Sequence, residues 1–182
     1  MKSSAPRYVP HYELEDYRQW EGDWELIDGV AISMSPSPFG PHERVISRLS
    51  RMFGNQFDSC RCPCEVYTNL DWIISDDTVI RPDLMVVCGE QPQQHLPRRP
   101  DIMVEVLSES TRGRDLTAKR ALCREQSVPH YLIIDPDAKT IEQISGERSM
   151  QYSAGDRLEL SIVTPANCSL EIHSALLFDQ QA

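Results

Sequence analysis

The sequence predicts an α/β fold, with a mixed central sheet flanked by helices, an N-terminal hairpin and a small β extension at the C-terminus. Two short runs, at 84–87 and 102–107, are rich in β-branched residues and almost continuously apolar. Such runs are typical of strands that are buried on both faces. Residues 111–126 are rich in helix formers and end before Val128-Pro129, which predicts a helix packed on that sheet.

The N-terminal part predicts a helix followed by a hairpin. Residues 12–20 place large apolar side chains three positions apart, which favours a short amphipathic helix. Residues 24–34 alternate in polarity, and Asp28-Gly29 has the composition of a tight turn. The two-residue period of a strand places Glu25 on the same face as Ile27, so Glu25 is not obviously directed to solvent.

The middle of the chain predicts a helix and a strand between two loops. The prolines of 35–41 indicate an irregular loop, and His42 then opens an amphipathic helix that extends to about Phe57. We expect a strand over 64–75, and a proline-rich loop after Gly89.

The C-terminal part predicts further β structure. Residues 131–135 form an apolar run that Pro136 ends, and 140–144 are expected to pair with it as a hairpin. From Gly146 onwards, alternating stretches indicate the small β extension.

Three ionisable residues lie within these apolar elements. Asp83 follows Pro82 at the start of one strand, Glu105 lies between two valines in the next, and Lys119 belongs to the helix. A buried carboxylate is costly unless it is paired or bound to a cation. If the helix packs back over the sheet, Lys119 reaches the strand ends that carry Asp83 and Glu105.

This combination suits metal-dependent hydrolysis of a phosphodiester. Mg²⁺ prefers oxygen ligands, commonly one or two carboxylates together with water and substrate phosphate. Such an ion activates water and polarises the phosphodiester, while a nearby lysine stabilises the developing charge. Asp83 and Glu105 are therefore the expected ligands of Mg²⁺ or Mn²⁺.

The ordered motifs resemble the Uma2 (DUF820) family, whose fold is of the PD-(D/E)xK restriction-endonuclease type. The motifs are WELIDGVAISMSPSP, PHERVISRLS, RPDLMVV, PDIMVEVLSEST, RDLTAKRAL and VPHYLIIDP. The resemblance implies that Glu25, Asp83, Glu105 and Lys119 are catalytic. The lysine is displaced onto the helix, because Leu107 occupies the position two residues after Glu105.

Some positions depart from the family pattern or are weaker candidates. Cys123, His130 and Leu132 replace residue types that are frequent in the family, outside the proposed metal shell. Arg98 and Arg99 lie in a loop that could contact substrate. A separate candidate is His42, which we expect either to contact substrate or to support Glu25, although an ordinary residue in the first helical turn is an equal alternative.

Length and charge bound the class of protein. The 182 residues suffice for a single domain over 1–182, with residues 1–10 expected to be flexible. The formal net charge of -10 argues against indiscriminate DNA binding but allows a local basic surface. The polar N-terminus lacks a signal-like apolar stretch, and no apolar run approaches the ~20 residues of a membrane span, so we expect a cytoplasmic protein.

Six cysteines are expected to remain reduced in such a compartment. Cys60, Cys62 and Cys64 alternate and would share one face of an extended segment. A zinc site would require a fourth ligand from elsewhere, so incidental thiols are the favoured interpretation of this cluster.

Two functional hypotheses follow. The first is a metal-dependent endonuclease that hydrolyses DNA, with a homodimer suggested by analogy. The second is a non-catalytic module that keeps the fold and binds nucleic acid or a protein partner, because fold does not fix function. A hydrolase of small phosphate esters is a third, weaker reading.

Overall fold

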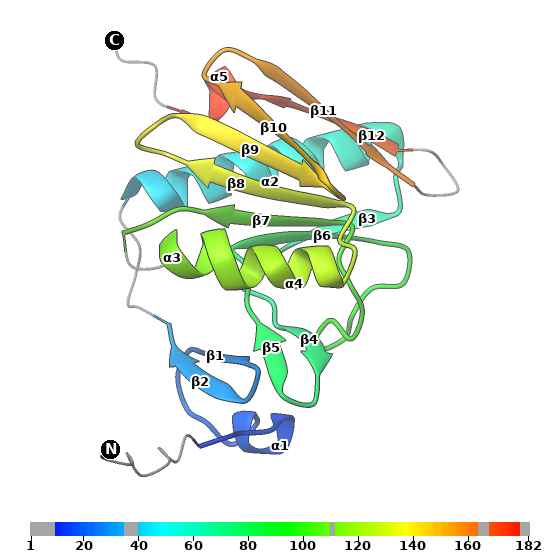
Figure 1. Cartoon of the computed structure of the whole chain (residues 1–182). Coiled ribbons are helices and arrows are strands. Elements are labelled where there is room, and N and C mark those ends of the chain that lie inside the picture. The colour runs from blue at the N-terminus through cyan, green and yellow to red at the C-terminus, as the bar shows by residue number, and fades with distance from the viewer. Residues whose placement is uncertain (1–9, 35–39, 110–111, 164–167, 179–182) are drawn as a thin grey trace, which may run out of the picture.

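A six-stranded mixed sheet forms the centre of the molecule in the computed structural model, which describes residues 10–34, 40–109, 112–163 and 168–178 (Figure 1). The strand order is β10-β9-β8-β7-β6-β3. The strands are β3 (Cys64–Thr68), β6 (Leu84–Cys88), β7 (Ile102–Val106), β8 (His130–Asp135), β9 (Thr140–Ser145) and β10 (Arg148–Ser153). The pair β7–β8 is parallel and its neighbours are antiparallel, which confirms the predicted mixed sheet.

A smaller sheet is formed by the N-terminal hairpin and a second hairpin, in the order β2-β1-β5-β4. Its strands are β1 (Trp24–Ile27), β2 (Val30–Ser33), β4 (Trp72–Ser75) and β5 (Thr78–Ile80). Asp28 and Gly29 have φ values of 50° and 74°, as a tight turn between twisted strands requires. The predicted hairpin is therefore confirmed, but the preceding helix α1 (Leu14–Tyr17) is shorter than expected.

The single strand predicted over 64–75 is wrong. The chain leaves the central sheet after β3, adopts φ = 54° at Asn69, and enters the small sheet as β4. Asp71 lies in this connection, and its carbonyl accepts a hydrogen bond from the Leu96 N–H at 2.9 Å. The apolar pattern continues across the turn because both strands are partly buried, so periodicity alone did not reveal the break.

One face of the central sheet is covered by helix α2 (Gly40–Cys60) and by a C-terminal hairpin. The hairpin consists of β11 (Arg157–Ile162) and β12 (Cys168–His173), followed by α5 (Ser174–Leu177). Helix α2 begins at Gly40, two residues before the predicted start at His42. Of the loop predicted over 35–41, residues 35–39 lie outside the described residues. The predicted C-terminal extension divides, since β10 joins the edge of the central sheet.

The opposite face is covered by a short helical connection between β7 and β8 (Figure 1). It comprises α3 (Arg112–Arg114), the π-helix η1 (Asp115–Lys119) and α4 (Arg120–Glu125). The sequence predicts a helix here but not its π-helical turn. Such turns are rare and often occur at functional sites.

The cysteines are not all reduced, which corrects the expectation from the sequence. Disulfides join Cys62 to Cys168 and Cys64 to Cys88, while Cys60 and Cys123 are free. Cys60 ends helix α2 and Cys64 begins β3, so the three alternating cysteines do not share one extended segment. In the part of the chain that is described, no helix has both the length and the apolarity needed to cross a bilayer.

Candidate active site

Lys119 lies at the centre of a buried cluster of carboxylates between the two sheets. Its side chain is only 2% exposed, and its Nζ lies 2.7 Å from Glu105 Oε1 and 2.9 Å from Glu25 Oε1. Asp115 Oδ1 lies 3.7 Å from the same ammonium. Residues from β1, β7 and η1, far apart in sequence, therefore converge on one point.

The central sheet and its crossover explain this convergence. Side chains alternate along β7, so Val104 and Val106 enter the core under α2, and Glu105 faces the helical crossover with Met103. Because β7 and β8 are parallel, the connection between them must cross one face of the sheet. That crossover carries Lys119 over Glu105.

Glu25 is held by one further hydrogen bond and by one further ion pair. The backbone N–H of Arg81 donates to Oε1 at 2.9 Å, and the Nε of Arg114 lies 3.1 Å from Oε2. The Glu25 side chain is 0% exposed, which agrees with the expectation that it does not face solvent. These contacts orient its carboxylate toward Lys119.

Asp83 occupies the more open side of the cluster, with a side chain that is 18% exposed. Its Oδ2 accepts a hydrogen bond of 2.8 Å from the backbone N–H of Val106, the residue after Glu105. His42 Nε2 lies 3.2 Å from the same oxygen. His42 therefore contacts Asp83. The expectation that it supports Glu25 is wrong.

Burial and neighbouring charges act against each other on the pKa values of Glu105, Lys119 and His42. Burial raises the pKa of Glu105 well above its usual value, although the ammonium of Lys119 opposes this shift. Burial alone would lower the pKa of Lys119, but Glu105 and Glu25 raise it instead. In the same way, burial opposes ionisation of His42, and Asp83 raises the pKa of its imidazole. Lys119 therefore remains an ammonium throughout the physiological range.

The cluster contains more carboxylates than cationic side chains. The buried carboxylates of Glu25, Glu105 and Asp115 outnumber the cationic side chains of Lys119 and Arg114 around them. Asp83 adds a further carboxylate at the open side. An excess of buried carboxylate oxygen is the environment that Mg²⁺ or Mn²⁺ neutralises.

The structure brings the four predicted catalytic residues and His42 together, but not Arg98 and Arg99. Arg98 donates to the carbonyl of Cys88, at the opposite end of β6 from Asp83. Asp83 and Cys88 are five positions apart along an extended chain, a separation of roughly 17 Å at the usual rise per residue. Arg99 donates to the carbonyl of Ser127. Both arginines therefore bond to backbone carbonyls, and Arg98 does so at the end of β6 that is remote from Asp83.

Sequence reasoning missed the role of Arg114. Arg114 forms an ion pair with buried Glu25. Its position beside Asp115 carries no signal of that contact, because the partner lies far away in the sequence. The π-helix was not predicted either. Asp115 and Lys119, its first and last residues, are both buried, so this turn directs both side chains into the protein.

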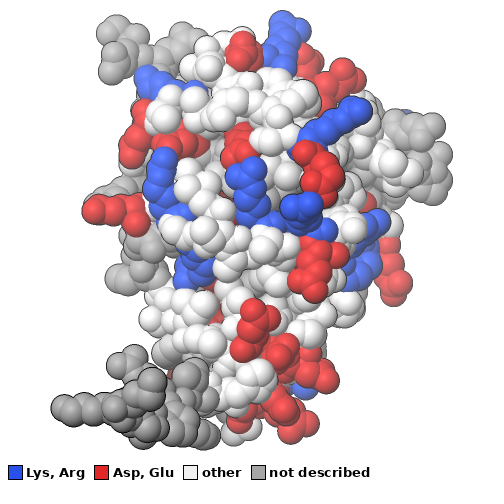
Figure 2. Space-filling model, in the orientation of Figure 1, with Lys and Arg blue, Asp and Glu red and all other residues white. Residues whose placement is uncertain are grey.

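Basic side chains form a band across the face that carries the crossover helix, while acidic side chains gather below it near the small sheet (Figure 2). Each arginine of the α3–α4 connection lies beside an acidic partner. The pairs are Arg112–Asp135, Arg114–Glu25, Arg120–Glu142 and Arg124–Glu147. The positive charge of this connection is therefore largely neutralised within the chain.

A mixed sheet with acids at its strand ends and a lysine on its crossover helix defines a protein of the restriction-endonuclease-like class. The chain belongs to the Uma2 family, whose sequence model, described as "Putative restriction endonuclease", matches residues 14–173. No curated protein matches the chain.

A solved structure shares the fold. It is the crystal structure of "a putative nuclease belonging to DUF820" from Anabaena variabilis ATCC 29413, which is 17% identical in sequence and superposes with a TM-score of 0.73. The match covers 91% of this chain and 96% of the other. At this identity, the similarity shows a common architecture.

Proposed function

We propose that this protein is a Mg²⁺- or Mn²⁺-dependent endonuclease that hydrolyses DNA phosphodiester bonds. The observation that carries the proposal is the convergence of Glu25, Glu105 and Lys119, from three separate elements, with Asp83, which precedes β6. Membership of a family described as restriction endonucleases supports the same reaction class.

Each residue has a distinct role in this proposal. Asp83 and Glu105 hold the cation, which when bound polarises the phosphodiester and activates water. Lys119 stabilises negative charge that builds on the phosphate, a role that requires the ammonium form its carboxylate partners favour. Glu25 orients Lys119, and His42 fixes the carboxylate of Asp83.

A plasmid-cleavage assay tests the proposal. The purified chain would be incubated with supercoiled plasmid and with oligonucleotide DNA, in the presence of Mg²⁺, Mn²⁺ or EDTA. We expect cleavage that needs the metal, and a loss of roughly 100-fold or more in Asp83→Asn and Glu105→Gln. Circular dichroism would verify that both variants are folded.

Glu65→Gln is the matched control for Glu105→Gln. Both glutamates occupy β-strands of the central sheet, but Glu65 is exposed, so its replacement should leave cleavage unchanged. Full cleavage by folded Glu105→Gln would show that the site is elsewhere. If the wild-type chain cleaves none of the substrates with either metal, the alternative function as a non-catalytic binding module replaces the nuclease.

A further inference from the structure

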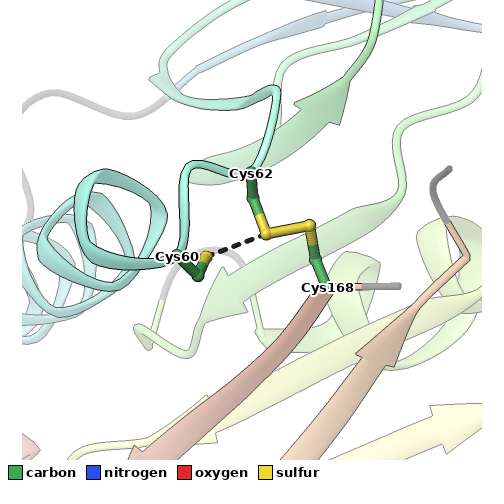
Figure 3. A group of neighbouring side chains, drawn as sticks. All are labelled: Cys60, Cys62 and Cys168. Atoms are coloured by element: carbon green, nitrogen blue, oxygen red, sulfur yellow. Dashed lines mark hydrogen bonds between the residues drawn. A yellow bond between two sulfur atoms is a disulfide. The ribbon is translucent and has the colours of Figure 1, made fainter. Parts of the chain in front are cut away.

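Three cysteine sulfurs converge at the end of helix α2, away from the carboxylate cluster (Figure 3). Cys60 is the last residue of α2, Cys62 follows in the turn, and Cys168 begins β12. Their sulfur atoms all lie within 4.8 Å of one another. Across the described ranges, no other group of three or more potential His, Cys, Asp or Glu ligands is this close.

The three sulfurs are not equivalent in this structure. Cys62 and Cys168 form a disulfide, whereas Cys60 is a free, exposed thiol whose Sγ lies 2.8 Å from Cys62 Sγ. The Cys60 side chain points toward the disulfide (Figure 3). Reduction of that one disulfide would therefore leave three thiols facing one another.

Three facing thiols are a ligand set for a soft cation. Thiolates bind Zn²⁺ at about 2.3 Å, which separates sulfurs on a tetrahedral ion by roughly 3.8 Å. All three sulfurs lie within 4.8 Å of one another, and the sulfurs of Cys62 and Cys168, once their bond is reduced, must move apart to reach that arrangement. Cys60 is exposed, so the ion has a route in and solvent can fill its fourth position.

We propose that Cys60, Cys62 and Cys168 form a zinc site in the reduced protein. A dithiol reductant gives two electrons and two protons to the Cys62–Cys168 disulfide and is itself oxidised to a disulfide. Zn²⁺ then binds the three sulfurs as thiolates, and the three thiol protons pass to solvent. In the reverse direction, a small-molecule disulfide accepts two electrons from the Cys62 and Cys168 thiolates and is reduced to two thiols, the Cys62–Cys168 bond re-forms, and the ion loses two of its ligands and is released.

The site would keep the same connection in two redox states. Cys62 and Cys168 are separated by 106 residues, and the disulfide joins the end of α2 to the C-terminal hairpin. Disulfides are uncommon in reducing compartments, where thiols persist as metal ligands. The zinc ion would hold the hairpin to α2 under the conditions in which the disulfide is lost.

Metal titration of the full chain tests this inference. The protein would be reduced with a dithiol, separated from it by anaerobic gel filtration, and titrated with Zn²⁺ against a chromophoric chelator. Co²⁺ would be added to a second sample, because sulfur ligation produces near-ultraviolet charge-transfer absorption that carboxylate ligation does not. We expect the reduced protein to bind one more Zn²⁺ per chain than the sample that retains the disulfide, and only the reduced protein to show the Co²⁺–sulfur absorption.

Cys60→Ser is the decisive variant, because Cys60 is exposed and its replacement is nearly isosteric. It should weaken Zn²⁺ binding by at least roughly 100-fold and reduce the Co²⁺–sulfur absorption. Cys123→Ser is the matched control, since Cys123 is the other free cysteine but lies in the opposite core, and it should bind as the wild type does. Undiminished Zn²⁺ binding by Cys60→Ser, or no binding by the reduced wild type, would overturn the proposal.

Discussion

Lys119 carries the positive charge on which two buried glutamates depend. Glu25 and Glu105 each place an oxygen within 3 Å of its ammonium, and all three side chains are almost completely inaccessible to water. Removing one partner of a buried ion pair leaves an uncompensated charge, which costs more than the pair contributes. The stability of the fold and the chemistry of the site are thus linked at one residue.

Replacing Lys119 with methionine tests this link. Lys119→Met should lower the free energy of unfolding by about 3–5 kcal/mol, because Glu25 and Glu105 lose their shared cation. Urea denaturation followed by circular dichroism would measure it. The double variant Lys119→Met/Glu105→Gln should recover part of the loss, and a double variant less stable than the sum of the two single changes would contradict this account.

Asp135 illustrates a carboxylate held in its charged form. Its Oδ1 accepts hydrogen bonds from the N–H groups of Asp137 and Ala138, and its Oδ2 lies 2.8 Å from Arg112. Burial opposes ionisation, but these donors outweigh it and lower the pKa of Asp135. Because the pKa of Asp135 is lowered on folding, its carboxylate stabilises the folded state at pH values above the ordinary pKa of 3.8. That stabilisation is lost as the pH falls through the pKa of Asp135 in the folded protein.

Asp135→Asn should therefore lower the free energy of unfolding by about 1 kcal/mol at neutral pH, with a smaller difference near pH 3. Urea denaturation at several pH values would show the two curves approaching each other on acidification. Asp137→Asn, at an exposed neighbouring position, is the control and should remain parallel to the wild type. A constant difference between Asp135→Asn and wild type would exclude the charge of Asp135 as the cause.

The sequence pointed to Asp83, Glu105 and Lys119 because they lie within apolar elements, where an ionisable residue needs a reason to be present, whereas Glu25 became a candidate through the family resemblance. It gave no comparable signal for Arg114, which lies in a polar stretch, or for the contact between Cys60 and the Cys62–Cys168 disulfide. Those contacts join segments far apart in the chain, so only the folded arrangement shows them.

Among the elements, helix α2 and strand β12 are joined by the side chain of Gln56, which bonds to the strand's backbone as a neighbouring strand would. The amide of Gln56 donates to the carbonyl of Glu171 at 2.8 Å and accepts from the N–H of the same residue at 2.7 Å. One glutamine thus satisfies both backbone groups of a residue on that strand. Hydrogen bonds as well as apolar contacts therefore hold the C-terminal hairpin against α2.

Gln56→Ala should lower the free energy of unfolding by about 1–3 kcal/mol, because both backbone groups of Glu171 lose their partner. Thermal and urea denaturation would measure the change. Gln19→Ala is a suitable control, since Gln19 makes a single exposed hydrogen bond to the carbonyl of Glu15 and should cost little. Equal effects of the two replacements would show that the hairpin does not depend on this contact.

Element types were largely predictable, but some boundaries and connections were not. The apolar runs correctly identified β6, β7 and β8, because burial on both faces leaves a strong compositional signal. The strand predicted over 64–75 failed at Asn69, where one left-handed residue redirects the chain into another sheet. The division of the C-terminal extension, in which β10 joins the central sheet, depends on long-range pairing that alternation does not encode.

For the whole molecule, two hydrophobic cores share the central sheet. One lies under α2 and the C-terminal hairpin, and the other lies between the crossover helix and the small N-terminal sheet. Since neither core can be dissolved without exposing a face of the same sheet, we predict that residues 1–182 unfold as one cooperative unit.

The tryptophans make this prediction measurable. Trp20, Trp24 and Trp72 are the three tryptophans, and all belong to the N-terminal elements or the small sheet. Their fluorescence should change at the same urea concentration as the far-ultraviolet circular dichroism, which reports on the entire chain. A fluorescence transition that precedes the dichroism would show that the small sheet melts separately, as a second domain.

The parallel pairing of β7 with β8 has a consequence for how the chain avoids misfolding. In the native register Glu105 lies opposite Ile133 and faces the crossover helix that bears Lys119. A slip of one residue would turn its side chain toward the apolar face of α2, into the core that contains Leu49 and Phe53. Glu105 thus disfavours a one-residue slip of the strand, because that alignment would bury its carboxylate in an apolar core.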